Sequence, residues 1–203
     1  MNKIERYKQA AVDALGDMSK AAAEAKAAYV KAERDEHGAQ NAFNEGITGR
    51  TGLANRMETI KADKDRAEKA MSDAFEKARE VVSEAREAAF TIDPADVPDG
   101  LFEVLGGCLM TPDEYAAMVT TYKGESNTAV RAVITAAKRN GLDVEDNAPA
   151  FIESVEGELD AFADYCHGMA VTTAYDRAWG GIVADSVSSI ETAYSGYMAA
   201  PWA

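Results

Sequence analysis

The sequence is poor in proline, in cysteine and in long apolar runs. Only five prolines occur in 203 residues, and four of them lie between residues 94 and 149. Because proline breaks helices, the long proline-free stretches on either side are free to form long helices. No apolar run reaches the roughly 18 residues that a membrane-spanning helix needs, and the start, MNKIERYKQA, lacks the apolar stretch of a secretory signal. Two cysteines, Cys108 and Cys166, are too few for a disulfide framework, so we expect free thiols in a reducing, intracellular setting.

Basic residues are scarce in the second half of the chain. Residues 1–92 hold 16 Lys and Arg against 17 Asp and Glu, whereas residues 93–203 hold 5 against 18. Phosphates and anionic membranes repel so acidic a surface. We therefore expect no direct nucleic-acid binding and no membrane binding.

Apolar residues and alanines recur in alternating steps of three and four through most of residues 1–92. The first series runs over residues 4–42 with a polar interruption at Asp35, and the second runs over residues 53–88 with Lys64 as its only charged member. This spacing is typical of helices that pack along a coiled-coil seam. The glycines of residues 46–52 supply the backbone freedom to reverse direction, and Thr51 can cap the second helix. Residues 1–92 are therefore predicted to form an antiparallel coiled-coil hairpin with its tip at 46–52.

The seam of this predicted hairpin consists mainly of alanine. Alanine allows close approach of helices but buries little area, so an isolated hairpin of this kind is marginal. We expect further contact with the rest of the chain, a second copy or another protein. The candidate interaction surface consists of the large side chains beside the seam, Tyr29, Val30, Phe43 and Phe75. The alternative is that the hairpin is a passive spacer with a solvated charged surface.

Residues 93–203 are predicted to form an acidic domain of four to five helices, which makes the whole chain all-α. The Asp93-Pro94 pair is expected to end the second arm, with a linker over 94–100. No segment alternates with the period of a strand. Helix starts are expected at capping residues: Thr111, Ser126 or Asn127, Asp146 or Asn147, and Thr172 or Thr173.

No residue pattern indicates chemistry. Cys166 and His167 are adjacent on a predicted helix and so point about 100° apart, unlike a nucleophile and its base. The acidic run 143–147 lacks the glycine and final glutamate of a calcium loop, and the histidines and cysteines lack zinc-site spacing. Gly180-Gly181 lies in a helical pattern without the lysine of a phosphate loop. We predict that the chain has no catalytic, cofactor-binding or metal-binding residues and that the protein is not an enzyme.

One segment carries a family resemblance. Residues 109–142 read LMTPDEYAAMVTTYKGESNTAVRAVITAAKRNGL. Through Leu109 to Tyr115 and Asn127-Thr128, this segment resembles small helical proteins encoded near the capsid genes of tailed bacteriophages. The resemblance covers about residues 99–142 by motif and 1–92 by architecture. It implies a scaffold-like or head-associated role in a bacterial host cell or a virion. The chain departs from many scaffolding proteins in ending with YMAAPWA instead of a basic helix.

Two hypotheses of function follow. The first is a non-enzymatic structural or assembly protein that self-associates or binds a protein partner through its hairpin. The second is an acidic, phage-encoded inhibitor that covers a basic nucleic-acid-binding surface of a host protein, since clustered carboxylates can imitate phosphates. An enzyme ranks last, although 35 acidic residues could hide a catalytic pair.

Overall fold

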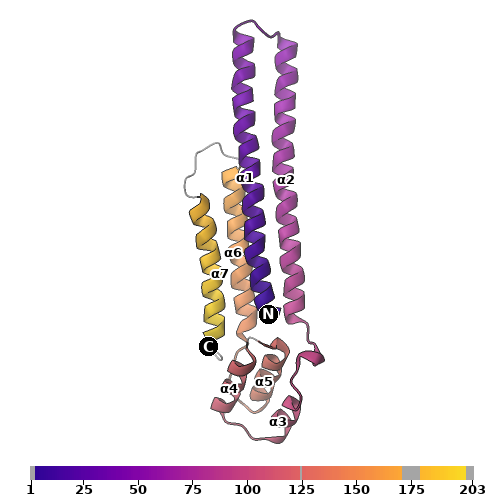
Figure 1. Ribbon diagram of the computed structural model, residues 1–203, viewed down its shortest axis with the longest axis vertical. Coiled ribbons are helices and arrows are strands. Elements are labelled where there is room, and N and C mark those ends of the chain that lie inside the picture. Colours follow the sequence, from indigo (N-terminus) through magenta and orange to yellow (C-terminus); the bar gives the residue numbers. More distant parts are fainter. Residues whose placement is uncertain (1–2, 124, 171–178, 200–203) are drawn as a thin grey trace. The chain divides into compact units, whose positions relative to one another are not determined.

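The computed structural model describes residues 3–123, 125–170 and 179–199 and is all-α, as the sequence predicts (Figure 1). These described ranges contain no strand. None of the helices in these ranges has the length and apolar character needed to cross a membrane. The elements in chain order are α1 (Lys3–Asn44), α2 (Arg50–Phe90), the short 3₁₀ helix η1 (Pro94–Asp96), α3 (Leu101–Gly107), α4 (Pro112–Tyr122), α5 (Asn127–Arg139), α6 (Asn147–Ala170) and α7 (Trp179–Ala199).

The predicted hairpin is present, and its turn is shorter than the sequence suggested. Helices α1 and α2 pack against each other, and the turn spans residues 45–49 instead of 46–52 (Figure 1). Gly46 takes a left-handed conformation with φ of 75°, and the amides of Ile47 and Thr48 donate to the carbonyl of Ala42. The amide of Leu53 already donates to the carbonyl of Gly49 at 3.0 Å. Thr51 therefore lies inside α2, and the expectation that it caps this helix is wrong.

The chain forms two compact units, and the long helices contribute to both. Unit 1 consists of Met1–Asp13, Glu80–Leu159 and Asp185–Ala203, and unit 2 of Ala14–Arg79 and Asp160–Ala184. The predicted division into domains at residue 92 stays a prediction. Helix α6 has 24 residues, of which the first half belongs to unit 1 and the second half to unit 2.

An aromatic cluster joins α1, α6 and α7 in unit 1. The ring of Phe151 lies 6.1 Å from that of Tyr7, 5.9 Å from that of Tyr194 and 5.3 Å from that of Tyr197. The hydroxyl of Tyr7 donates to the carbonyl of Ile152 at 3.3 Å. Such aromatic pairs contribute about 0.5–1.5 kcal/mol beyond the area they bury. This cluster holds the start of α1 against α6 and α7.

Helices α3, α4 and α5 share a small core in unit 1. Thr111 caps α4 in a capping box with Glu114, and the Ser126 hydroxyl accepts from the amide of Ala129 at 3.0 Å to cap α5. Both starts, and the Asp146 contact to the amide of Ala148 at 3.1 Å, agree with the predicted capping residues. The expected start at Thr172 or Thr173 lies outside the described residues. The core consists of Leu101, Tyr115, Val119, Ala129, Val130, Val133, Ile134, Ala137 and Val144.

The second arm ends three residues earlier than the Asp93-Pro94 pair suggested. The side-chain amide of Asn127 donates to the carbonyl of Ala89 at 2.8 Å, and Arg131 Nη1 reaches the carbonyl of Phe90 at 3.5 Å. A longer helix would have bonded the carbonyl of Ala89 through the amide of Asp93, whereas the carbonyl of Phe90 would face Pro94, which has no N–H. Helix α2 therefore stops at Phe90.

The buried stripe of α2 differs from the predicted seam in its second half. The structure buries Phe75 and Val82, whereas the steps of three and four counted from Leu53 place their neighbours Ala74 and Val81 on the seam. Phenylalanine gains several times more from burial than alanine does, so the helix turns its larger side chains inward. Val81 is consequently 44% exposed.

Candidate protein-interaction groove

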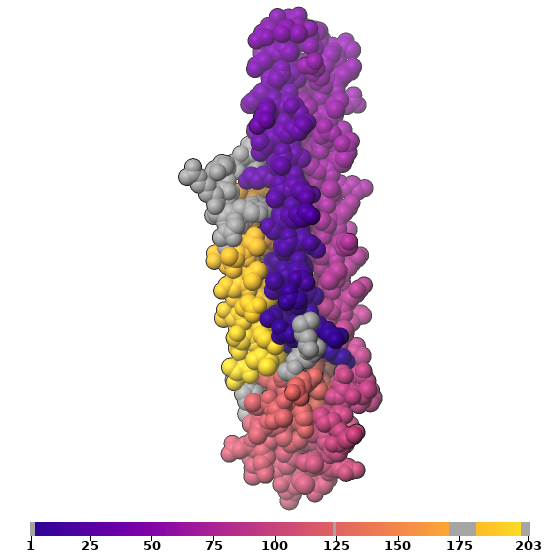
Figure 2. Space-filling model, in the orientation of Figure 1, coloured from indigo at the N-terminus to yellow at the C-terminus, as the bar shows by residue number. Residues whose placement is uncertain are grey.

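The part of the hairpin nearest its turn has almost no core. We call residues 26–70 the outer hairpin; all of it belongs to unit 2. Within it only Ala32, Ala39 and Ile60 are buried apolar residues. Other large seam residues, Leu53 and Met57, are only half-buried. The visible face of the hairpin near its turn consists of α1 and α2 alone (Figure 2).

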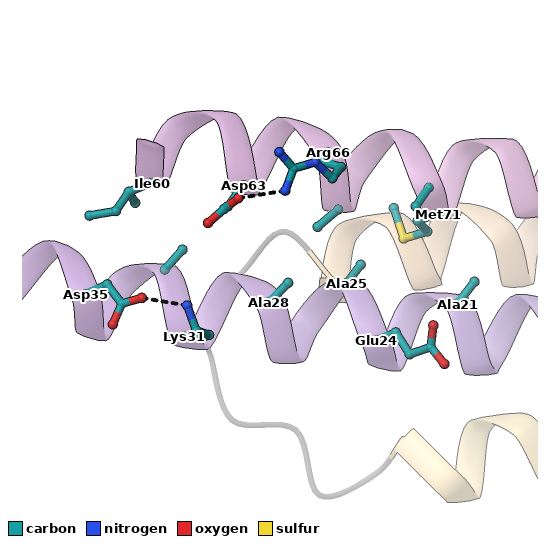
Figure 3. A pocket seen from close by; sticks show the side chains of 13 residues that line it. Ala21, Glu24, Ala25, Ala28, Lys31, Asp35, Ile60, Asp63, Arg66 and Met71 are labelled. Carbon is teal, nitrogen blue, oxygen red and sulfur yellow. Dashed lines mark hydrogen bonds and ion pairs between the residues drawn. The ribbon is translucent and has the colours of Figure 1, made fainter. Parts of the chain in front are cut away.

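A groove of about 360 Å³ lies between α1 and α2 in unit 2 (Figure 3). Its floor is apolar and includes Ala25 and Ala32 from α1 and Ile60 and Met71 from α2, which are all less than 9% exposed. Partly exposed alanines form its walls, among them Ala28 of α1. Alanine has too small a side chain to fill the space between two helices, so the seam remains hollow.

Charged side chains of both signs border the groove. Lys31 Nζ lies 2.8 Å from Asp35 Oδ2 on α1, and Arg66 Nη1 lies 2.8 Å from Asp63 Oδ1 on α2 (Figure 3). The hydrogen bond to Asp35 raises the pKa of Lys31. Both pairs are largely exposed, so each contributes little to stability. An apolar floor with a mixed-charge rim is the composition of a protein-interaction surface.

Two polar contacts tie α1 to α2 across the outer hairpin. Lys64 Nζ lies 3.2 Å from Glu36 Oε2, and the hydroxyl of Tyr29 donates to Glu68 Oε2 at 3.3 Å. Burial, and then the neighbouring charge of Glu68, raise the pKa of Tyr29. The charged seam position Lys64 is thus explained by an ion pair between the two helices.

The four residues of the predicted interaction surface have different environments. Val30 is 38% exposed, while Tyr29 and Phe43 are half-buried. Phe75 is 7% exposed, so the folded chain itself already covers this large ring, and contact with the rest of the chain was one of the expected alternatives. None of the four lines the groove. The signal that could have identified the groove is the use of alanine at consecutive seam positions between charged neighbours.

Cys166 and His167, which are neighbours on α6, have different environments. Cys166 is fully buried, and burial raises the pKa of its thiol to about 12. The side chain of His167 is 55% exposed, and its Nε2 lies 3.9 Å from Glu68 Oε1. A thiol with so high a pKa is almost entirely protonated at neutral pH and is a poor nucleophile.

The other residues considered for a chemical role are the possible metal ligands, the acidic run 143–147 and the Gly180-Gly181 pair. Within the described ranges, no three His, Cys, Asp or Glu residues gather as metal ligands would. Asp146, from the acidic run, caps α6. Gly180-Gly181 lies inside α7.

Comparison with known proteins adds no family to this picture. No protein-family model, curated protein or solved structure matches the chain. The interpretation of the groove therefore depends on its own geometry.

Proposed function

We propose that the protein is a non-enzymatic structural or assembly protein that acts through protein–protein contacts of its outer hairpin. The observation that carries this proposal is the alanine-lined groove between α1 and α2, which extends into the outer hairpin, where only three apolar residues are buried. A head-associated or scaffold-like role in a bacteriophage is the specific form of the proposal that the resemblance of residues 99–142 supports.

The energetics of the outer hairpin support a partner. Ordering the backbone costs roughly 1–2 kcal/mol per residue, and long helices without tertiary packing are marginal in water. Burial of Ala32, Ala39 and Ile60 offsets only a small part of that cost. A helix laid into the groove would cover the floor, because alanine surfaces allow helix axes to approach to about 8 Å.

The charges of the hairpin support a partner that is a protein. With 16 basic and 17 acidic residues in positions 1–92, the hairpin has no excess of one sign to attract a polyanion or a polycation. A second copy of the hairpin and a helical segment of another protein both satisfy this condition.

The test compares two substitutions at neighbouring alanines. Ala28 lines the groove, whereas Ala27 is exposed and lies outside it. Ala28→Glu places a carboxylate on the apolar contact and is expected to weaken association at least tenfold, because a charge buried without a partner is costly. Ala27→Glu adds the same charge to the same helix and is expected to change association less than twofold.

Association is measured by sedimentation of the full chain over a range of concentrations and, where the same genome encodes a major capsid protein, by binding to that protein. A wild-type chain that stays monomeric and binds no capsid protein would overturn the proposal. Equal effects of the two substitutions would show that association does not use the groove. If the gene for this protein lies far from any portal, protease or major capsid gene, this would count against the bacteriophage role in particular.

A further inference from the structure

A second groove, of about 530 Å³, lies within unit 1 between α3 and α5. Ile92 lies at its edge and α3 contributes Phe102 and Leu105, while the lining residues of α5 are Thr128, Arg131, Ala132, Thr135, Ala136 and Arg139. We call this the α3–α5 groove. It shares no residue with the hairpin groove, so a function assigned to it is independent of the proposal above.

The two faces of α5 explain why this groove exists. One face, with Val130, Val133 and Ile134, is buried in the core of unit 1. On the other face, Ala132 and Ala136 are only partly buried and lie in the groove. Their small side chains leave space beside α3, where a larger residue would have closed the contact.

Large apolar side chains are exposed at the α3–α5 groove. Ile92 is 64% exposed and Phe102 is 63% exposed, and both line it. Leu109, in the segment that follows α3, is 99% exposed. A cluster of exposed apolar side chains beside a concave surface marks an interaction site.

The groove also holds two of the few positive charges in the acidic half of the chain. Residues 93–203 contain five basic residues against 18 acidic ones, and Arg131 and Arg139 both line the α3–α5 groove. Two neighbours hold Arg131 in place. Its Nε lies 3.7 Å from Asp146 Oδ2, and its guanidinium lies 5.9 Å from the centre of the Phe90 ring. Arg139 has no ion-pair partner among the described residues and is exposed at the end of α5.

We propose that the α3–α5 groove binds an acidic amphipathic helix of a partner protein. Its apolar face would contact Phe102 and Ile92, and one of its carboxylates would pair with Arg139, since guanidinium groups bind carboxylates in bidentate geometry. A second carboxylate would approach Nη2 of Arg131, since Nε and Nη1 of this residue face Asp146 and the carbonyl of Phe90. The two arginines are eight positions apart on α5, or about 12 Å along its axis. Carboxylates two helical turns apart match that distance.

The occupant is another protein and not a second copy of this chain. Two copies would bring together two acidic halves, each with 13 more acidic than basic residues, which is the difference between 18 and 5. That repulsion opposes self-association at this surface. A short acidic helix carries few charges, so it meets much less of this repulsion than a second acidic half would.

The probe is a synthetic helical peptide with leucine and phenylalanine on one face and two glutamates seven residues apart. A control peptide carries lysines in place of the glutamates. Binding of each to the full chain is measured by fluorescence anisotropy, and the contact is located by chemical shift changes. We expect the glutamate peptide to bind at least tenfold more tightly and to shift the signals of Ile92, Phe102 and Arg139.

Matched variants distinguish peptide binding in this groove from a general effect of charge or hydrophobicity. Arg139→Gln is expected to weaken binding of the glutamate peptide about fivefold or more, and Lys138→Gln less than twofold, although both remove one charge from the last turn of α5. Phe102→Ala is expected to weaken it similarly, whereas Val104→Ala, at an exposed residue of α3 outside the groove, is expected to have little effect.

The proposal is overturned if neither peptide binds, if the lysine peptide binds equally well, or if Lys138→Gln weakens binding as much as Arg139→Gln. Self-association of the chain that Phe102→Ala abolishes would also overturn it, in favour of a second copy as the occupant. None of these results bears on the hairpin groove, which the Ala28→Glu comparison tests separately.

Discussion

Lys64 on α2 and Glu36 on α1 face each other across the outer hairpin, with 3.2 Å between Nζ and Oε2. Their side chains are 30% and 40% exposed, so solvent screens the attraction. Exposed pairs of this kind stabilise proteins by at most about 1 kcal/mol. A charged residue in an otherwise alanine-rich seam mainly specifies how the two helices align, as polar seam residues do in coiled coils.

A double-mutant cycle on this pair should give a small coupling energy. We expect Glu36→Gln, Lys64→Gln and the double variant to report about 0.2–1 kcal/mol of interaction in chemical denaturation. The exposed Lys61, on the same helix, serves as the control position for loss of a positive charge. A coupling energy above about 2 kcal/mol would contradict the screened pair described here.

Phe75 and Val30 should respond very differently to truncation. Phe75→Ala is expected to cost about 3–5 kcal/mol of unfolding free energy, because it leaves a cavity where a large ring was buried. Val30→Ala, at an exposed position of α1, should stay within about 0.5 kcal/mol. Denaturant unfolding followed by circular dichroism measures both. Similar values for the two would contradict the burial of Phe75.

The two thiols should react at different rates. Cys108 is exposed, whereas Cys166 is fully buried and burial raises its pKa to about 12. We expect a thiol-specific reagent to modify one cysteine rapidly in the native protein, and the second only as the protein unfolds. Cys108→Ser should abolish the rapid phase. A rapid phase that persists in this variant would contradict the packing of α6.

Stability should fall at alkaline pH because of the aromatic cluster in unit 1. Burial is the main factor that raises the pKa of Tyr7, Tyr194 and Tyr197 above the ordinary value of 10.0. The native state therefore keeps protons that the unfolded chain loses, so this contribution is fully present below about pH 10 and is lost as pH rises further. Lys123 acts in the opposite direction, since burial lowers its pKa.

The alkaline loss can be assigned to particular tyrosines. Tyr197→Phe keeps the ring that stacks on Phe151 at 5.3 Å and removes one ionisable group. We expect its unfolding free energy to fall less steeply above about pH 10 than that of the wild type. Denaturation at a series of pH values, with tyrosinate absorbance as the measure of ionisation, tests this. An equal slope in both proteins would contradict the role of Tyr197.

Local sequence signals predicted the helices well, because they depend on neighbouring residues. The capping box of Thr111 and Glu114 and the cap at Ser126 are contained within four residues each. The end of α2 at Phe90 was missed because it depends on Asn127, 37 residues further along the chain. Distance in sequence explains this miss, whereas the wrong cap at Thr51 arose within the local pattern of the turn.

The two grooves show a different limit of sequence-based prediction. A repeated alanine indicates that helices approach closely, but it does not say whether they fill the space between them. The hollow beside Ala28, and the exposure of Phe102, are properties of packing in three dimensions. The sequence alone directed attention to the large side chains Tyr29 and Phe75, which the fold largely uses for its own contacts.

The spacing of the buried alanines has a consequence for how such a protein can evolve. Ala25, Ala32 and Ala39 lie seven residues apart on α1, so one heptad of the arm presents nearly the same surface as the next. Inserting or deleting seven residues in both arms would keep the pattern and change the reach of the hairpin by about 10 Å. Relatives of this chain are then expected to differ in arm length by multiples of seven residues.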